Sequence, residues 1–416
     1  MKLFVSCIPY DKGKSGISVY VREVVRELCR QGHELTLLCE PEEKRRERRF
    51  PEEGVPAGRD EARPFCQVVD DLGEAALSPL HEIRHVHAPR WTRRPMLSML
   101  WHLFVLPFWI RRHRKEFDGF VICAANRRVC AWYPLPTTAT VHDLANFHVP
   151  GKYSRLRMFY LAHVLPHFAK KAQRLVAVSG ATKTDMVRFW KCRDEDVTVL
   201  YNGLPGRGTG DGRQQAYDNK ISATANHEPR TANHEPRTTI LYISRIEHPG
   251  KNHVRLIEAY GRLPRAVAEA HPLVIAGADW KDAETVHAAA AASPHAAFIR
   301  FTGFVPEGEL EKLWDAAGYY VFPSLFEGFG LSLVEAMARG IPCACSNNGS
   351  LGEIAGDAAL TFDPENAGEI ADALLRLVSE PEQERSARIA RGRNWVKRYS
   401  WSDHAAGLVN LLEGAA

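Results

Sequence analysis

Short apolar, β-branched runs alternate along this chain with longer stretches in which apolar residues recur at helical spacing. In residues 253–263, for example, Leu256, Ile257, Tyr260 and Leu263 fall on one helix face. Strands that alternate with helices are typical of parallel sheets covered on both faces. The predicted strands are residues 3–7, 34–39, 120–124, 139–141, 175–178 and 197–201, followed by 240–243, 273–276, 298–301, 319–322 and 342–345.

The strand–helix pattern occurs twice in series, which predicts two doubly wound α/β domains, and the length of 416 residues suits two such domains. Between them lies a stretch that is rich in glycine and polar residues and poor in aliphatic ones. The predicted division is a first domain over residues 1–203, an insertion over 204–239, a second domain over 240–390 and a C-terminal helix over 391–416.

Two polar segments interrupt this pattern. The unit TANHEPR occurs twice in tandem, at residues 224–230 and 231–237. Two copies are too few to build a solenoid, so the repeat indicates a surface insertion. Residues 41–64 contain a run of charged side chains, which we interpret as a solvated loop.

Composition narrows the class of protein. Hydrophobic residues make up 45% and charged residues 25%, a balance typical of globular domains. The formal net charge of +4 is small for this length and does not favour a nucleic-acid partner. The nine cysteines include no CxxC pair and no zinc-type spacing, which indicates reduced, buried thiols. The N-terminal run lacks the pattern of a signal peptide, so we expect a cytoplasmic protein.

Residues 323–340, PSLFEGFGLSLVEAMARG, carry the clearest chemical signal. A predicted strand leads into a glycine-bearing turn over residues 327–330 and then into a helix from about Leu331. Glycines allow the backbone to approach a ligand closely, and a helix start offers free N–H groups to a phosphate. Glu327 and Glu335 lie eight residues apart, at most ~12 Å along a helix, about the ribose-to-hexose distance in a sugar nucleotide.

A second chemical cluster is residues 244–252, SRIEHPGKN, directly after the first strand of the second domain. Its two cations, Arg245 and Lys251, stand on one loop and are both able to reach a diphosphate. They would stabilise negative charge as a nucleotide leaves. We also expect Asn252 to cap the helix that follows.

Several polar or glycine positions directly follow predicted strands. Ligands bind at the carboxyl ends of strands in open parallel sheets, so two sheets that face each other would bring these positions together. They are His142, Ser179, Asn202, Arg245, Gly277 and the turn over residues 324–330.

These strings resemble glycosyltransferase family 4, the retaining GT-B enzymes also called glycosyl transferases group 1. The match covers the PSxxEGFGLxxxEAMxxG signature, in which Glu327 and Glu335 form the E-x7-E motif, the segment that reads SRIEHPGKN here, and the HDL at His142. It extends from Gly16 to about Leu377 and is strongest in the second half. At the loop after the first strand, Ser15-Gly16 replaces the family's usual Gly-Gly pair.

The resemblance implies a GT-B fold, with two facing Rossmann-like domains and a last helix that crosses back onto the first. It further implies a retaining hexosyltransferase that moves sugar from a nucleoside-diphosphate sugar to a glycan or lipid-linked acceptor, in cell-surface polysaccharide or lipopolysaccharide synthesis. No metal is expected, because no acidic cluster such as DxD ends a strand of the second domain. No cofactor is expected either, since the nucleoside-diphosphate sugar would be a substrate.

The resemblance also implies residue roles. Arg245, Lys251 and the helix after Gly330 would hold the diphosphate, Glu335 the ribose and Glu327 the sugar hydroxyls. The implied catalytic residues are His142, Glu327, Arg245 and Lys251; the implied donor-binding residues are Arg245, Lys251, Gly277, Phe304, Val305, Glu327, Gly328, Phe329, Gly330, Leu331 and Glu335; Gly16 and His142 lie on the acceptor side.

Two alternative functions remain at this point. One is another enzyme of the same architecture, either a sugar-nucleotide epimerase or a phosphorylase, and the phosphorylase would require a lysine-bound pyridoxal phosphate. The other is a non-catalytic scaffold that keeps the GT-B fold. Both phosphate-binding cations and both glutamates are present, which argues against the scaffold.

Residues 90–115 contain seven basic side chains and no acidic one. Within them MLSMLWHLFVLPFWI is apolar at 12 of 15 positions, shorter than the ~20 residues that span a bilayer. One interpretation is a core helix with charged ends. The other is a peripheral contact with an anionic membrane, with Trp101 and Trp109 at headgroup depth. The basic residues are Arg90, Arg93, Arg94, Arg111, Arg112, Arg114 and Lys115.

Overall fold

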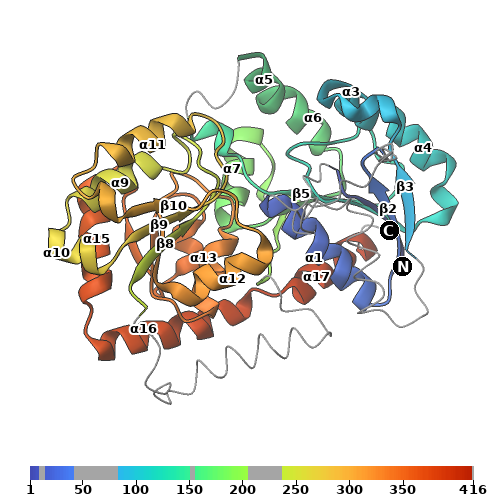
Figure 1. Cartoon of the computed structure of the whole chain (residues 1–416). Helices are drawn as coiled ribbons and strands as arrows, with labels where there is room; N and C mark the ends of the chain where they lie inside the picture. Colours follow the sequence, from blue (N-terminus) through green and yellow to red (C-terminus); the bar gives the residue numbers. More distant parts are fainter. Residues whose placement is uncertain (9–14, 42–82, 150–154, 205–236, 415–416) are drawn as a thin grey trace, which may run out of the picture.

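A computed structural model describes residues 1–8, 15–41, 83–149, 155–204 and 237–414, and in these residues the chain forms two α/β domains (Figure 1). The first sheet has the order β3-β2-β1-β4-β5-β6-β7 and the second the order β10-β9-β8-β11-β12-β13. The strands of the first are β1 (Lys2–Ser6), β2 (Glu34–Cys39), β3 (Arg84–His87), β4 (Gly119–Ile122), β5 (Thr137–Val141), β6 (Arg174–Ala177) and β7 (Val197–Val199). Those of the second are β8 (Thr239–Ile243), β9 (Leu273–Ala276), β10 (Ile299–Phe301), β11 (Ala317–Phe322), β12 (Cys343–Ser346) and β13 (Leu360–Phe362).

Both sheets are parallel and doubly wound, which confirms the predicted fold class. The strand order reverses between β1 and β4 in the first sheet and between β8 and β11 in the second. Ligands bind beyond the carboxyl ends of the strands at such a switch point. The loop of Arg245 follows β8 and the turn of Glu327 follows β11, so both lie at the second switch point.

All eleven predicted strands are present, and two further strands were missed. Both missed strands, β3 and β13, are at sheet edges. β3 reads RHVH and β13 has three residues, so neither carries the apolar run that marks a strand buried on both faces.

Helices cover both sheets. The predicted apolar face of residues 253–263 is buried, with Leu256, Ile257, Tyr260 and Leu263 each at most 5% exposed. The helices are α1 (Gly16–Arg30), α3 (Pro95–Leu100), α4 (Leu106–Arg112), α5 (Arg155–Phe159), α6 (Leu165–Ala169), α7 (Gly180–Trp190), α9 (His253–Gly261), α10 (Arg265–Ala270), α11 (Ala283–Ala291), α12 (Glu307–Ala316), α13 (Leu331–Ala338), α14 (Leu351–Ala355), α15 (Ala367–Ser379), α16 (Glu382–Trp395) and α17 (Trp401–Glu413). Single π-helical turns join α3 to α4 and α5 to α6.

The last helix belongs to the first domain. After α16 the chain crosses back, and α17 packs beside α1, as predicted (Figure 1). The Tyr20 hydroxyl of α1 lies 2.9 Å from Thr140 Oγ1 on β5 and 2.9 Å from His404 Nε2 on α17. The core of the first domain is therefore closed by the far end of the chain.

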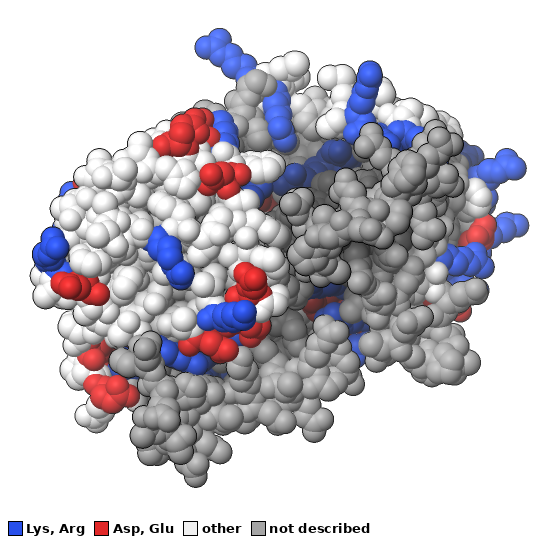
Figure 2. All heavy atoms as spheres, in the orientation of Figure 1, with Lys and Arg blue, Asp and Glu red and all other residues white. Residues whose placement is uncertain are grey.

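The structure also bears on the cysteines, the two polar segments and the surface charge. The eight cysteines in the described part of the chain are buried and unbridged, as expected for reduced thiols. The charged segment over residues 41–64, apart from Pro41, and the TANHEPR repeat, apart from Arg237, lie outside the described residues. On the face in Figure 2, charges of both signs mix over the second domain, whereas Lys and Arg predominate along the upper edge above α3 and α5.

Candidate active site

The predicted donor residues lie around the ends of β8 and β11. Lys251 Nζ is 2.6 Å from Glu327 Oε1, in an ion pair that joins the two sequence motifs. Arg245 Nη2 is 3.5 Å from Glu247 Oε2, and the guanidinium carbon is 5.2 Å from the ring centroid of Trp280. The two cations therefore follow the same strand end, at the switch point of the second sheet.

The turn that presents Glu327 requires glycine at two positions for different reasons. Gly330 has φ +97°, a left-handed conformation that strains any residue with a Cβ. Gly328 packs its backbone directly on the His142 carbonyl oxygen, where a Cβ would clash. The turn then leads into α13, which begins at Leu331 as predicted. The start of α13 therefore offers free backbone N–H groups and the positive end of the helix dipole directly after the turn.

Glu335, one turn further along α13, has a different partner. Its Oε1 lies 3.0 Å from Arg339 Nη2, and the same guanidinium nitrogen is 2.6 Å from Glu311 Oε1 on α12. A carboxylate held by a side chain on its own helix has a fixed rotamer and still retains acceptor capacity for hydroxyl groups.

The two domains meet at this turn. Thr182 Oγ1 on α7 lies 3.3 Å from the His142 carbonyl oxygen and 3.4 Å from that of Gly328. The imidazole of His148 stacks on Phe326 with ring centroids 4.1 Å apart. The first domain therefore covers the Glu327 turn, and the structure brings His142 next to that turn as the strand-end argument predicted.

His142 follows β5 and is held on two sides. Its Nε2 lies 2.7 Å from the Cys123 carbonyl oxygen, and Tyr20 contacts its ring edge-to-face at 4.5 Å. Burial lowers the pKa of His142 to about 4. The imidazole is therefore neutral at pH 7, Nε2 carries the proton that it donates to Cys123, and Nδ1 keeps a lone pair.

The loop of Arg245 is fastened to the neighbouring strand end by backbone hydrogen bonds. The N–H of Ile246 donates to Ala278 (3.0 Å), that of Trp280 to Ile246 (2.9 Å) and that of His248 to Lys281 (3.1 Å). This pairing fixes the path of the loop and brings the exposed Trp280 ring under Arg245.

The expectation that Asn252 caps α9 is wrong. Asn252 has φ 60° and makes no side-chain cap; its Nδ2 donates to the carbonyl oxygens of Pro323 (2.9 Å) and Pro364 (2.7 Å). Buried carbonyl groups need donors, and asparagine tolerates the left-handed conformation, so tertiary contacts outweigh the local cap. The side chain thus ties the Lys251 loop to the end of β11.

The other predicted positions lie around the same site. Gly277 has φ +155° and packs on the Ser244 backbone, and its N–H donates to Gly303 over 3.0 Å. Phe304 is 61% exposed and Val305 is half-buried. Gly16, at the start of α1, faces Leu331 of the second domain, with only 3.7 Å from an added Cβ to Leu331 Cδ1.

Comparisons with known proteins bear on both domains. A family model described as Glycosyltransferase Family 4 matches residues 14–205, and one described as Glycosyl transferases group 1 matches residues 224–395. The chain belongs to glycosyltransferase family 4.

Among similar proteins, an Escherichia coli O-antigen chain mannosyltransferase B is 28% identical over 66% of this chain and 69% of its own. The Escherichia coli serotype-specific mannosyltransferase WbdA is 30% identical over 68% of this chain, which spans only 34% of that longer relative. Anabaena Alr3699/HepE, solved with UDP and glucose, covers 99% of both chains with a TM-score of 0.65 and 17% identity. At this identity the structural likeness concerns the GT-B fold.

In this glycosyltransferase, motif reasoning missed two residues beside the site. Trp280 carries Arg245 on its face although its ring is 61% exposed. Glu353, on α14, binds backbone groups of the first domain. A tryptophan four residues after a predicted strand was a visible signal for the first. No spacing in the sequence identifies the second.

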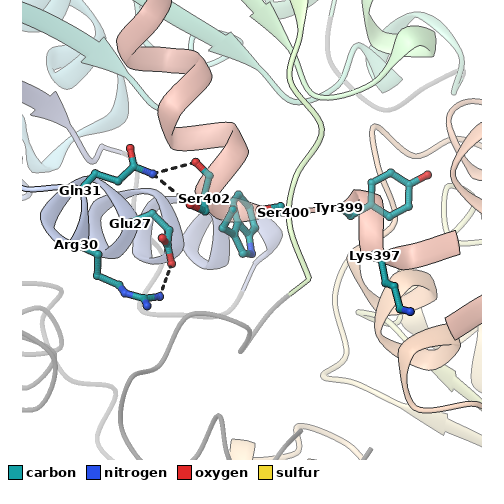
Figure 3. Close-up of a pocket in the computed structure, with 8 residues that line it drawn as sticks. Glu27, Arg30, Gln31, Lys397, Tyr399, Ser400 and Ser402 are labelled. Carbon is teal, nitrogen blue, oxygen red and sulfur yellow. Dashed lines mark hydrogen bonds and ion pairs between the residues drawn. The ribbon is translucent and has the colours of Figure 1, made fainter. Parts of the chain in front are cut away.

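A separate pocket of about 450 Å³ lies where the end of α1 meets the start of α17 (Figure 3). Polar groups in its wall are bonded to each other: Gln31 Nε2 donates to the Ser402 backbone carbonyl over 2.9 Å, and Arg30 Nη1 is 3.1 Å from Glu27 Oε1. None of the predicted site residues lines it. The lining residues are Glu27, Arg30, Gln31, Lys397, Tyr399, Ser400, Trp401 and Ser402.

Proposed function

We propose that this glycosyltransferase moves a hexose, with retention of anomeric configuration, from a nucleoside-diphosphate sugar to a glycan or lipid-linked acceptor. The observation that carries the proposal is the Lys251–Glu327 ion pair, at 2.6 Å, in the turn whose Gly328 packs on the His142 carbonyl oxygen of the opposite domain. A cation suited to phosphate and a carboxylate suited to hydroxyl groups thus lie in the turn that the first domain contacts through the His142 backbone.

The donor would lie across the end of the second sheet. Arg245 and Lys251 bind the diphosphate together with the N–H groups that begin α13, and Glu335 binds the ribose. Backbone at Gly277, Phe304 and Val305 borders the base. The solved structures of Anabaena Alr3699/HepE with UDP and with UDP-glucose support a nucleotide-sugar donor on this fold.

In the reaction, the bond between the anomeric carbon and the phosphate oxygen breaks and negative charge develops on the diphosphate. Arg245 and Lys251 stabilise that charge. The incoming acceptor hydroxyl forms the new glycosidic bond on the same face and passes its proton to the departing phosphate oxygen. Glu327 orients the sugar hydroxyls, and neutral His142 accepts a hydrogen bond through Nδ1. Because Glu327 is paired with Lys251, it is a poor nucleophile for the covalent route of retaining hydrolases.

The relatives support the proposed acceptor class. O-antigen mannosyltransferases match in sequence, and the lipopolysaccharide glycosyltransferase WaaG matches in fold with a TM-score of 0.63. We therefore propose a role in cell-surface polysaccharide or lipopolysaccharide synthesis, on the cytoplasmic side of the membrane, without a cofactor.

The test is a panel of UDP- and GDP-linked hexoses, measured by thermal shift and by release of the nucleoside diphosphate, with the anomeric proton of the product read by NMR. A donor that stabilises the protein and yields a product of the same anomeric configuration is expected. Inversion would contradict the mechanism. Absorbance from bound pyridoxal phosphate would favour the phosphorylase, and the absence of any donor binding would favour the scaffold.

Transfer should not require a divalent metal, because Arg245, Lys251 and the start of α13 supply the positive charge that a metal would otherwise bring. We expect full activity in excess EDTA after the protein has been dialysed against it. Activity that is lost in EDTA and restored by magnesium or manganese, but not by sodium, would contradict this expectation.

The basic, apolar segment over residues 90–115 has two different faces in the structure. Trp101, Leu103, Leu106 and Ile110 are buried, which confirms a core role for one face. The expected headgroup position of Trp101 is therefore wrong, because this ring is only 6% exposed, and Trp109 packs on Phe4 at 5.2 Å between centroids. Close packing of these rings under the first sheet outweighs any exposure at a membrane.

The opposite face of the segment is exposed and apolar, and α5 extends it. Eight of the twelve large apolar side chains that are exposed in the described residues lie here, and none of the described helices is long and apolar enough to cross a membrane. Exposed arginines accompany them, including Arg111 and Arg112 on α4 and Arg155 and Arg157 on α5. The eight are Trp91, Met96, Leu100, Phe104, Val105, Phe108, Leu156 and Phe159. We propose that this face rests on an anionic membrane that holds the acceptor.

In a flotation assay at low salt, the protein should rise with vesicles that contain phosphatidylglycerol and not with neutral vesicles. Each arginine near the surface adds about 1 kcal/mol, so Arg111→Glu/Arg112→Glu should abolish flotation. Arg300→Glu/Arg376→Glu makes the same change of charge at exposed positions of the second domain and should float normally. Equal flotation of both double variants, or none by the wild type, would contradict the membrane contact.

A further inference from the structure

The carboxylate of Glu353 on α14, in the second domain, is bound by three donors from the first. The backbone N–H of Gly180 lies 2.8 Å from Oε1, that of Ala181 lies 2.9 Å from Oε2, and the Tyr201 hydroxyl lies 2.7 Å from Oε1. Both carboxylate oxygens are used, and all three bonds cross between the domains.

The position that Glu353 occupies is the start of α7. The first N–H groups of a helix have no partner within the helix, and a negative charge is favoured there. Ser179 accepts a bond from the N–H of Thr182 at 3.1 Å, and Glu353 takes the two N–H groups between them. The absence of a side chain at Gly180 makes room, since a Cβ would lie 3.0 Å from Glu353 Oε1. The cap of α7 is thus completed by a side chain from the other domain.

Both ends of this contact lead to the reaction centre. On the first-domain side, Thr182 of α7 lies within 3.4 Å of the carbonyl oxygens of His142 and Gly328. On the second-domain side, Ser350 at the start of α14 donates through Oγ to the Glu327 carbonyl over 3.0 Å. Glu353 therefore joins the helix beside His142 to the segment that supports Glu327.

The third donor strengthens the contact at neutral pH. Burial, and next the hydrogen bond to Glu353, raise the pKa of Tyr201, so its hydroxyl stays protonated and donates. The Tyr201 carbonyl oxygen in turn lies 3.0 Å from His404 Nδ1 on α17, which anchors the tyrosine in the first domain.

We propose that Glu353 is an interdomain positioning residue, which sets the spacing between His142 and the Glu327 turn by capping α7 from the opposite domain. It touches neither donor nor acceptor in this proposal. Each domain keeps its own core without it, because its three partners all lie across the interface. Its loss should therefore change how the domains sit together and leave each one folded.

The first test needs no substrate. Glu353→Gln keeps the size of the side chain but offers one carbonyl oxygen where the carboxylate offers two. Small-angle X-ray scattering should show a larger radius of gyration than for the wild type, with an unchanged melting temperature. Glu369→Gln is the matched control, since that carboxylate also accepts a backbone N–H, from Asp363 at 2.9 Å, but within one domain. Identical scattering of Glu353→Gln and the wild type would overturn the inference.

The second test rests on the proposed function. With the nucleotide sugar found active in the panel, Glu353→Gln should lower kcat by up to about 100-fold, because small misplacements of reacting groups are costly. KM for the donor should stay within twofold of the wild-type value. Tyr201→Phe removes one of the three hydrogen bonds to Glu353, so its kcat should lie between those of the wild type and Glu353→Gln. A raised donor KM with unchanged kcat would overturn the positioning role. If no sugar is transferred by the wild type, the proposed function fails while the scattering result still decides the inference.

Discussion

Alanine at Lys251 should lower kcat/KM by about 30- to 150-fold, equivalent to ~2–3 kcal/mol of transition-state stabilisation, and alanine at Arg245 by a similar factor. The reason is charge: a diphosphate that leaves a mostly closed cleft without its cation loses a charge-assisted contact. Glu327→Ala should lower mainly kcat, whereas Glu335→Ala should raise mainly the KM for the donor. Steady-state rates of nucleoside diphosphate release measure the effects of all four substitutions.

The ion pair complicates the result for Lys251, and a double variant resolves it. Lys251→Ala removes the partner of Glu327, whose side chain is 17% exposed, so part of the loss reflects a carboxylate without its counter-charge. If that part is large, Lys251→Ala/Glu327→Ala will cost less than the sum of the single changes. Lys281→Ala, at a lysine 48% exposed on the neighbouring loop, is the control and should stay within twofold. Near-normal transfer by both cation variants would remove the donor site from this position.

The protein should lose stability steeply between pH 6.5 and pH 5. Burial lowers the pKa of His102 and His253 to about 3 and that of His142 and His404 to about 4. In the unfolded chain a histidine titrates near 6.5, so above that pH neither state is protonated and the stability is complete. As the pH falls below 6.5, these histidines are protonated in the unfolded chain but stay neutral in the folded chain. Each of the four histidines therefore lowers the free energy of unfolding by about 2 kcal/mol at pH 5.

Urea unfolding at pH 7.5, 6.5, 5.5 and 5.0 measures this loss. His404 makes hydrogen bonds through both ring nitrogens, so His404→Gln will destabilise the fold at every pH, but it should also make the dependence on pH shallower by one histidine's share. His163→Gln, at an exposed position, should leave the slope unchanged. A free energy of unfolding that is constant from pH 7.5 to 5.0 would show that these imidazoles are accessible to protons.

Sequence reasoning succeeded where the signal is local. All six residues of β11 are buried, so the strand reads as a continuous apolar run, and the glycine turn and helix that follow it are contiguous in the chain. The two motifs with Lys251 and Glu327 could be brought together because both directly follow strands of one parallel sheet. Edge strands such as β3 gave no such run.

Prediction failed where the partner lies far away in the sequence. Asn252 looks like a helix cap, and only the fold shows that two proline carbonyls need its amide. Glu353 and Gly180 are separated by 173 residues and belong to different domains, so no periodicity relates them. The faces of residues 90–115 are another case, because their apolar residues give no indication of which side meets the sheet.

The crossing of α17 onto the first domain has a consequence for biosynthesis. Domains generally fold as units as they leave the ribosome, the N-terminal one first. Tyr20 and the inner face of α1 pack against Trp401, His404 and Leu408 of α17. These three residues are synthesised near the end of the described chain, so the contacts form late. The second domain therefore emerges complete while the first still exposes apolar surface, and the chain's earliest residues are among the last to reach their native environment.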